Sequence, residues 1–334
     1  MRTQMLHEEQ KPSPHSPGER IELRCPVCAA ALGMLAIDRA SDLLSYDCSR
    51  CTYSMVSRKG IWQALRPERL AHFTRFLDDY QKVRAAEGRG SQKPEFYLTL
   101  PYGDITGHNS WQWKIRARTF ECLTGEILPS CRSCGTQKPR ILDLGAGNGW
   151  MSYRLALEGC HPVAADIVTN ELDGLGAAVH FERELCPLFP RIRAEMSSLP
   201  FADGQFDAVV FNASFHYAED YHVVLSEALR CLTTGGMVVI ADTPWYSSDE
   251  SGRQMLAERR ATFAKRFGTT SESICSLEYL TDRRLRELEN DLNIHWEVAT
   301  PSYGLRWAMR PLVAKLRGRR EPSQFRIYAA RKAA

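Results

Sequence analysis

The sequence predicts an α/β protein in which helices cover both faces of a largely parallel sheet, preceded by a small metal-binding domain and a helical linker region. Three observations predict this arrangement. Strand-like and helix-like segments alternate after Lys138, three glycines directly follow the first strand-like run, and two C-x2-C pairs stand near the N-terminus. We therefore expect four parts, with boundaries at residues 1–20, 21–65, 66–135 and 136–334.

The composition is that of an ordinary globular protein without targeting segments. Its 334 residues allow two or three domains of roughly 100–200 residues, and its net charge of +3 does not indicate a polyanion-binding protein. The apolar runs are shorter than the ~20 residues of a membrane span. Residues 1–20 lack the apolar core of a secretory signal, and we expect a disordered tail. Eleven cysteines without such a signal indicate a reducing, cytoplasmic location.

The domain at residues 21–65 contains a predicted zinc site. Cys25, Cys28, Cys48 and Cys51 form the pattern C-x2-C-x19-C-x2-C. Two such turns direct four thiolates at one point, which is the tetrahedral arrangement that Zn²⁺ prefers. Alternating apolar residues between the pairs predict short strands, and hence a zinc ribbon. Because four thiolates leave no open position, the metal is expected to be structural and to stabilise a domain with little core. The alternative is four unrelated free cysteines.

Residues 66–135 are predicted to be largely helical. The segment "PERLAHFTRFLDDYQKVRAAEG" repeats apolar residues at helical spacing, and a second helix is expected in "SWQWKIRARTFECL". Trp111 and Trp113 are expected to be core residues. A further C-x2-C pair, Cys131 and Cys134, is a redox pair, half a metal site or part of an ordinary loop. We favour the loop, since no second pair lies near it in sequence.

Residues 136–334 alternate between strands and helices. Strands are expected in "RILDL", "HPVAADI", "RIRAE", "FDAVVFN" and "MVVIAD", and helices in "GWMSYRLALEG", "LGAAVHFEREL" and "YHVVLSEALRCL". This order predicts a Rossmann-like parallel sheet with helices on both faces. The segments "HWEVAT" and "QFRIYAARK" are expected to add an antiparallel edge to that sheet.

The glycines after the first strand mark the predicted ligand-binding edge of the sheet, because ligands of open α/β sheets bind outside the carboxyl ends of the strands. Gly145, Gly147 and Gly149 allow a sharp turn and a close approach of a ligand to the backbone. Their G-x-G-x-G spacing differs from the G-x-G-x-x-G dinucleotide fingerprint. Asp143 adds a carboxylate that would repel a pyrophosphate and that suits a ligand with an ammonium group.

With the motifs that follow it, this loop resembles the class I S-adenosylmethionine-dependent methyltransferases, in particular the family with a ubiquinone-type methyltransferase core. The resemblance covers residues 138–242 and rests on "ILDLGAGNG", "AADI", "AEMSSLPFADGQFDAVVFN" and "LTTGGMVVIAD". It implies S-adenosylmethionine as the cofactor and methyl transfer as the reaction.

The resemblance also implies which residues would hold the cofactor. The methionine part would lie against Asp143 and the loop, the ribose against the end of the second strand, the adenine after the third strand and the sulfonium near the end of the fourth. The residues concerned are Asp143, Gly145, Ala146, Gly147, Gly149, Asp166, Ile167, Glu195, Met196 and Asn212. Glu195 stands where the family usually has Asp, which leaves its role open. The alternative for Asp166 and Glu195 is a pair of solvated loop acids.

The segment after the fourth strand, "NASFHYAED", is expected to face the methyl acceptor. His216 is the candidate general base, because its unperturbed pKa of ~6.5 suits neutral pH. The alternative is a packing histidine. Tyr217 is a candidate wall or orienting residue. Trp245 and Tyr246, after the fifth strand, either close over the acceptor or form a packing plug.

A basic insert, residues 305–320, separates the last two predicted strands. Residues 301–334 carry nine Lys or Arg and one acid. Leu305, Met309, Leu312 and Leu316 can share one face of a helix, with Pro311 as its start or kink. Such a segment would meet an anionic membrane surface or RNA phosphates. The alternative is a solvated surface helix.

Three functions remain open from the sequence. The leading one is a methyltransferase acting on a small or lipid-like metabolite. The second is an RNA methyltransferase with a zinc module, which the near-neutral overall charge disfavours. The third is a non-catalytic adaptor that binds the cofactor and uses the zinc ribbon to bind a protein partner. The intact glycine loop and the acidic end of the second strand argue against this third function.

Overall fold

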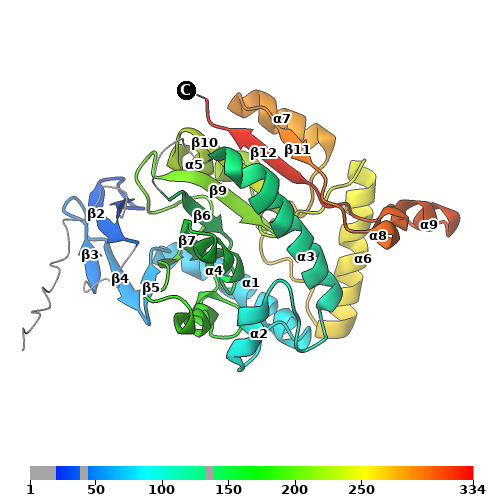
Figure 1. Ribbon diagram of the computed structural model, residues 1–334, viewed down its shortest axis with the longest axis horizontal. Helices are drawn as coiled ribbons and strands as arrows, with labels where there is room; N and C mark the ends of the chain where they lie inside the picture. Colours follow the sequence, from blue (N-terminus) through cyan, green and yellow to red (C-terminus); the bar gives the residue numbers. More distant parts are fainter. Residues whose placement is uncertain (1–19, 38–43, 132–137, 334) are drawn as a thin grey trace, which may run out of the picture.

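The computed structural model describes residues 20–37, 44–131 and 138–333. One sheet of ten strands runs through these residues (Figure 1), and a separate hairpin pairs β1 (Arg20–Arg24) with β2 (Ala31–Ala36). The order of the large sheet is β11 (Glu297–Ala299), β12 (Ile327–Arg331), β10 (Leu232–Ala241), β9 (Phe206–Asn212), β6 (Arg140–Leu144), β7 (His161–Asp166), β8 (Arg191–Arg193), β5 (Ile61–Gln63), β4 (Ser54–Arg58) and β3 (Ser45–Asp47). The tail predicted at residues 1–20 and the pair Cys131 and Cys134 lie outside the described residues, apart from residue 20 and the backbone of Cys131.

The centre of the sheet confirms the predicted fold class. Strands β10, β9, β6, β7 and β8 are parallel neighbours, and β12 and β11 add the antiparallel edge. The helices are α1 (Pro67–Ala86), α2 (Pro94–Thr99), α3 (Ser110–Cys122), α4 (Trp150–Leu157), α5 (Tyr221–Cys231), α6 (Asp249–Phe267), α7 (Asp282–Leu292), α8 (Leu305–Ala308) and α9 (Arg310–Leu316). From β6 the chain runs outward to β7 and β8, and it then returns to the other side of β6 for β9 and β10. This reversal leaves a crevice between the carboxyl ends of β6 and β9, where ligands of such sheets bind.

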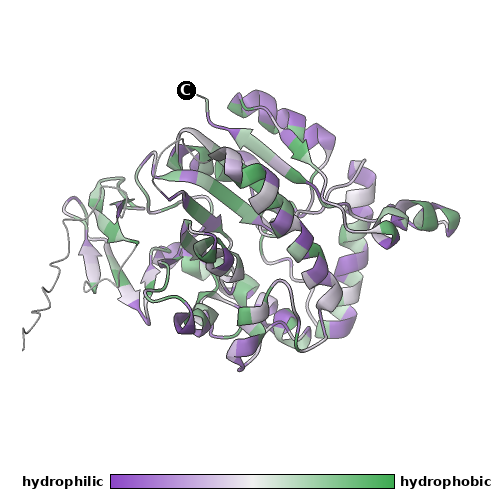
Figure 2. Cartoon of the chain, viewed as in Figure 1, coloured by the Kyte–Doolittle hydropathy of each residue, from purple (hydrophilic) through white to green (hydrophobic). Residues whose placement is uncertain are grey.

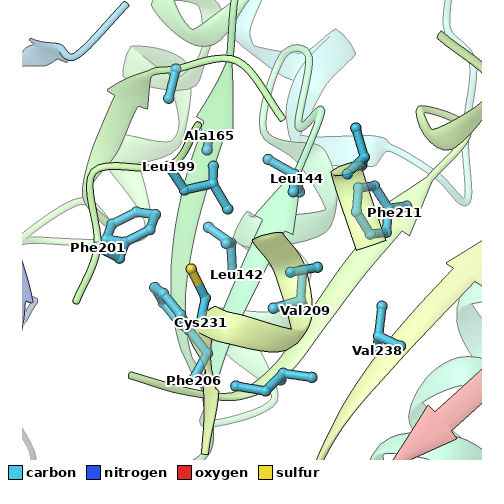
Figure 3. Packing of buried hydrophobic residues seen from close by; sticks show 14 of the residues in the cluster. Leu142, Leu144, Ala165, Leu199, Phe201, Phe206, Val209, Phe211, Cys231 and Val238 are labelled. Atoms are coloured by element: carbon cyan, nitrogen blue, oxygen red, sulfur yellow. The ribbon is translucent and has the colours of Figure 1, made fainter. Parts of the chain in front are cut away.

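Alternate residues of the central strands point to opposite faces of the sheet and build two cores. Leu142 packs on one face with α5, α7 and the N-terminal strands, while Ile141 packs on the other with α3 and α4. Figure 3 shows the first core, where Leu142, Val209 and Phe211 meet from adjacent strands. Each such fully buried side chain contributes roughly 1.5–3 kcal/mol relative to an exposed one.

The N-terminal module is joined to the main sheet. Strand β5 pairs in parallel with β8, with Trp62 opposite Ile192, and β4 and β3 continue the sheet as antiparallel neighbours. Leu23 and Tyr46 belong to the same buried cluster as Leu142. The module therefore supplements its small core with that of the α/β region.

Several segments differ in detail from the sequence-based expectations. The helix expected in "LGAAVHFEREL" is the 3-10 segment η4 (Leu175–Arg183). Two short segments of other helical types follow α3, namely η2 (Leu123–Ile127) and η3 (Leu128–Cys131). Another, η5 (Phe215–Tyr217), follows β9. A side chain at Gly176 would lie 2.8 Å from the carbonyl of Thr169, so η4 is held tightly against the loop after β7. Strand β10 begins at Leu232, earlier than expected, because its first residue already pairs with Phe206.

The basic insert forms two short helices that extend away from the body (Figure 1). Pro311 lies in the first turn of α9, where its missing N–H is tolerated, and the chain breaks between α8 and α9. Neither helix has a buried residue, and the apolar side chains of α9 colour it strongly hydrophobic (Figure 2). No helix in the described part of the chain is long and apolar enough to cross a membrane.

Candidate active site

A cavity of about 830 Å³ opens at the carboxyl edge of the central strands. Its floor is formed by the segments that follow β6, β7, β9 and β10, and its roof by α1, α3 and α6. The volume lies within the roughly 300–1,000 Å³ of ligand sites, at the edge where such sheets bind ligands. Most of the predicted site residues line it, namely Gly145, Ala146, Gly147, Asp166, Ile167, Glu195, Met196, Asn212, His216 and Tyr217.

The glycine loop is shaped by protein contacts as well as by the cavity. A Cβ atom on Gly145, whose φ is +81°, would lie 2.2 Å from the Cβ of Ser214, so the neighbouring loop excludes a side chain there. Gly147, with φ +56°, has only the carbonyl of Asp173 near its Cβ position, at 3.6 Å. Both glycines line the cavity, and of the two only Gly147 has open space at its Cβ position.

Asp166 closes the end of β7. Its carboxylate accepts hydrogen bonds from the backbone N–H groups of Gly147, at 2.7 Å, and Val168, at 2.8 Å. Burial raises the pKa of Asp166 to about 6, although these two hydrogen bonds lower it. Each carboxylate oxygen has a further lone pair that can accept a bond from a ligand in the cavity.

Glu195 lies next to the end of β8 and is almost completely buried. It accepts a 2.7 Å hydrogen bond from Nε of Arg69 on α1 and a 3.0 Å bond from the hydroxyl of Ser197. Arg69 also pairs with Glu219 at 3.3 Å. A helix that follows the N-terminal module thus fixes an acid at the cavity edge, so Glu195 is not the solvated loop acid of the alternative interpretation.

Unsatisfied acceptors gather at the ends of β9 and β10. Oδ1 of Asn212 and Oδ2 of Asp242 are buried and have no hydrogen-bond partner among the described residues. Asp242 and Ala213 have φ values of +51° and +56°, which are costly for residues with side chains. Buried acceptors of this kind normally have partners. These two therefore indicate a ligand that donates hydrogen bonds at this point.

Residues 142–240, which include the glycine loop, match the family model of a methyltransferase domain. Over 104 residues the chain is 36% identical to the demethylmenaquinone methyltransferase of Clavibacter sepedonicus, and over 103 residues it is 34% identical to that of Mycobacterium marinum. These residues form a class I S-adenosylmethionine-dependent methyltransferase domain. The alignments cover 31% of this chain, and the chain spans about 40% of the length of these curated relatives.

A solved structure with a similar arrangement is geranyl diphosphate C-methyltransferase from Streptomyces coelicolor. It is 17% identical and has a TM-score of 0.47, covering 69% of this chain and 86% of that protein.

After the end of β9, His216 and Tyr217 line the cavity together. Nδ1 of His216 is buried and has no partner in the described residues. Burial lowers the pKa of His216 to about 4, with Arg259 acting in the same direction and Glu278 opposing. The imidazole is therefore neutral at pH 7. The ring of Tyr217 contacts Phe76 and Tyr80 of α1, with centroids 5.9 Å apart in both pairs.

Three predicted site residues lie away from the cavity. The carboxylate of Asp143 is directed at α4, where it accepts bonds from the hydroxyl of Ser152, at 2.7 Å, and its backbone N–H, at 3.2 Å. Gly149 faces Phe189. Tyr246 is 2% exposed and packs edge-to-face on Tyr279 behind the cavity wall. The geometry therefore assigns Asp143 to the start of α4 and favours the packing alternative for Tyr246.

Sequence reasoning missed the roof of the cavity. Arg84 of α1 makes a bidentate ion pair with Asp173, and Arg259 of α6 makes another with Glu278, at 2.6 and 2.7 Å. Apolar and aromatic residues fill the space between these pairs, namely Phe73, Phe76, Trp111, Ile115, Phe263, Ile274, Trp307 and Phe325. Trp111, expected in the core, is 43% exposed and lines this roof instead. The spacing of aromatics on α1 was visible in the sequence, but their position over the cavity was not.

The four cysteines of the N-terminal module come together as predicted. Their sulfur atoms all lie within 4.8 Å of one another, with 3.6 Å between Cys25 and Cys51 and 3.4 Å between Cys28 and Cys48. In a tetrahedral site with Zn–S bonds of about 2.3 Å, the sulfurs are roughly 3.8 Å apart. The cluster therefore has the ligand type and the dimensions of a four-thiolate zinc site.

Proposed function

We propose that the protein is a methyltransferase that transfers the methyl group of S-adenosylmethionine to a small, lipid-like acceptor. The observation that carries this proposal is a cavity that is lined by the methyltransferase motifs and roofed by aromatic side chains. S-adenosylmethionine supplies a methyl group already activated on a cationic sulfur. The protein's task is then to align the acceptor with that methyl group and to exclude water.

The residues at the floor fit the cofactor. Asp166 has free lone pairs for the two ribose hydroxyls, and Gly147 leaves its backbone open to a ligand. Glu195 and Met196 border the adenine end, where Arg69 fixes the carboxylate of Glu195. Ala146 and Ile167 complete the apolar surround. Asp143 contributes indirectly in this proposal, by holding α4 and the end of the glycine loop.

The groups at the ends of β9 and β10 would activate the acceptor. A neutral His216 with a free Nδ1 is ready to accept a proton from an acceptor hydroxyl, amine or carbon acid. Tyr217 would orient the acceptor against the aromatic wall. The unpartnered oxygen of Asn212 would lie beside the reacting centre.

The lipid-like nature of the acceptor rests on the roof and on the relatives. Aromatic side chains from α1, α3, α6 and the C-terminal insert surround the space that the cofactor motifs leave. The relatives act on demethylmenaquinone, as their name states. A flat or isoprenoid-like molecule suits such a wall better than a sugar or a nucleotide, because aromatic faces bury apolar surface efficiently.

We further propose that the four-cysteine cluster binds one structural zinc ion. All four ligands are thiolates, so no position is open for catalysis. Because β5 pairs with β8, the metal would also stabilise the edge of the main sheet beside the end of β8, which precedes Glu195.

The exposed face of α8 and α9 is proposed to contact anionic lipid, which would bring the protein to a membrane-dissolved acceptor. Leu305 and Leu316 are 79% and 77% exposed, while Arg317 and Arg319 have no ion-pair partner among the described residues. Exposed leucines beside free arginines complement a lipid surface that is apolar below an anionic head-group layer.

The direct test is methyl transfer from tritiated S-adenosylmethionine to lipid, metabolite and RNA fractions. Label in the lipid or metabolite fraction supports the proposal. Label in RNA alone would overturn it in favour of an RNA methyltransferase, and binding of the cofactor without transfer to any fraction would favour an adaptor.

A further inference from the structure

Several arginines line the roof of the cavity, and they differ in how fully acids pair with their guanidinium groups. Arg84, Arg89 and Arg116 all line it, from α1, the segment after α1, and α3. Arg84 is neutralised by its bidentate pair with Asp173. The other two are not matched in this way, and they are the basis of the inference that follows.

Arg89 is only 7% exposed, yet one of its guanidinium nitrogens is buried without a partner among the described residues. Its Nε pairs with Glu87 at 2.9 Å, while Nη1 is buried without a hydrogen bond in the described part of the chain. An unsatisfied buried donor on a charged group costs more than an ordinary unmade hydrogen bond. Its position at the cavity wall indicates that a ligand supplies the missing acceptor.

Arg116 has neither an ion pair nor a hydrogen bond among the described residues, and its guanidinium lies 4.8 Å from the ring centroid of Trp113. Burial lowers its pKa to about 10, with the like charges of Arg89 and Arg84 adding to the effect. The group is still protonated at pH 7. Asp242 is the acid that partly offsets this charge, but it lies beyond ion-pair distance and is bonded to Thr119 at 2.6 Å instead.

Two phenol groups add further unused donors. Tyr80 and Tyr217 line the same cavity, and neither hydroxyl makes a hydrogen bond among the described residues. Burial raises the pKa of both groups, so both remain protonated and able to donate. Among the described residues, Arg89, Arg116, Tyr80 and Tyr217 thus bring unused donors to the cavity, whereas Asn212 and Asp242 bring unused acceptors.

The position of Arg116 assigns this charge to the acceptor and not to the cofactor. Thr119 lies one turn after Arg116 on the same side of α3, and its bond to Asp242 anchors that turn over the end of β10. The cofactor motifs occupy the other half of the sheet edge, at the ends of β6, β7 and β8. Arg116 therefore faces the half that the acceptor would fill.

We infer that the acceptor is an amphipathic oxyanion: an apolar body against the aromatic roof, a carboxylate or phosphate held by Arg89 and Arg116, and a protic group directed toward Asn212 and Asp242. This inference rests on the proposed function for its assignment to the acceptor. The anion site itself is independent of methyl transfer and can be tested by binding alone.

The experiment compares three probes by calorimetry on the full-length protein: 2-naphthoate, 2-naphthyl phosphate and the neutral 2-naphthalenemethanol, with and without S-adenosylhomocysteine. At least one anion should bind about tenfold tighter than the alcohol, because charge-assisted hydrogen bonds from the arginines form with an anion and not with a neutral hydroxyl. The two anions distinguish a carboxylate site from a phosphate site. Arg116→Gln should remove most of that advantage without affecting the alcohol, and Arg116→Lys should restore part of it.

Arg118→Gln is the matched control, because Arg118 lies two residues further along α3 with an exposed side chain paired with Glu121. It should leave all three affinities unchanged. Equal binding of both anions and the alcohol to the wild type would overturn the inference. The inference would also be overturned if Arg116→Gln weakened the binding of S-adenosylmethionine alone and left the binding of its decarboxylated analogue unchanged. The arginines would then bind the cofactor's carboxylate. Failure of S-adenosylhomocysteine to bind the wild type would contradict the proposed function instead, and leave the anion comparison intact.

Discussion

The backbone N–H of Gly147 donates a 2.7 Å hydrogen bond to the carboxylate of Asp166, which ties the glycine loop to the end of the neighbouring strand. These residues are 19 positions apart and belong to two motifs that the sequence shows separately. Their contact explains why the loop and the acidic strand end occur together. The same carboxylate organises the loop and remains available to a ligand.

Replacing Asp166 by alanine should weaken S-adenosylhomocysteine binding by tenfold or more, because both the ribose partner and the anchor of the loop are lost. Calorimetry measures the change. Glu171→Ala is the control, since Glu171 follows the same strand but is exposed and outside the cavity. Equal affinity of Asp166→Ala and wild type would remove Asp166 from the binding site.

Cys25→Ser and Cys48→Ser should each reduce bound zinc from one per chain toward none, as measured by metal analysis of the purified protein. We also expect a lower unfolding temperature for the whole chain, because β5 pairs with β8 and the two regions share one buried cluster. Cys275→Ser, at an exposed cysteine, should change neither quantity. Full zinc content in both cluster variants would show that the metal, if bound, has other ligands.

His216→Ala should lower turnover much more than cofactor affinity, by roughly 10²–10⁴-fold if His216 is a general base. The pH profile gives a sharper test. Because burial lowers the pKa of His216 to about 4, the base is neutral and active down to about pH 5, and activity should fall only below that. An acid limb near pH 6 would instead point to another group, such as Asp166, whose pKa burial raises to about 6. Unchanged turnover in the variant would make His216 a packing residue.

How far the site could be predicted depended on whether its parts are local in sequence. The sequence placed the glycine loop, Asp166 and Asn212 at the cavity because each ends or directly follows a strand whose pattern is readable. The pairing of Arg69 with Glu195 joins residues 126 positions apart, and no local pattern encodes it. Asp143 shows the opposite case: its position in the motif was correct, but only the structure reveals that its carboxylate is directed at Ser152.

Asp143 has a measurable consequence for stability. Burial raises its pKa to about 7, from 3.8 in an unfolded chain, despite the hydrogen bonds from Ser152. The folded state thus holds a proton that the unfolded state has released between about pH 4 and pH 7. Stability from this group is present below pH 4 and is lost as the pH rises to about 7.

The Asp143→Asn variant lacks this pH dependence of stability, because asparagine does not titrate. The free energy of unfolding of the variant, relative to wild type, should therefore rise by on the order of 1 kcal/mol or more between pH 5 and pH 7.5. Urea denaturation at both pH values measures it, and Asp291→Asn, at an exposed position, serves as the control. A difference between variant and wild type that is the same at both pH values would contradict a raised pKa at Asp143.

The last prediction concerns the exposed face of α8 and α9. Its arginines are not equivalent, since Arg320 pairs with Glu258 at 2.9 Å and contacts Tyr246, and so belongs to the fold. The apolar residues are the cleaner targets. Leu312→Ser combined with Leu316→Ser removes side chains that are 50% and 77% exposed, so folding should be little affected.

The double variant should bind vesicles of mixed phosphatidylserine and phosphatidylcholine several-fold more weakly than wild type in a sedimentation assay, while cofactor affinity is unchanged. Leu157→Ser is the matched control, because Leu157 on α4 is also 50% exposed but lies outside the insert. Binding of the wild type should weaken with added salt, because Arg317 and Arg319 lie beside the leucines and salt screens their attraction to lipid head groups. If the double variant bound vesicles as tightly as the wild type does, the exposed face would be an ordinary solvated surface. Salt-sensitive binding to RNA with none to vesicles would assign the insert to RNA instead.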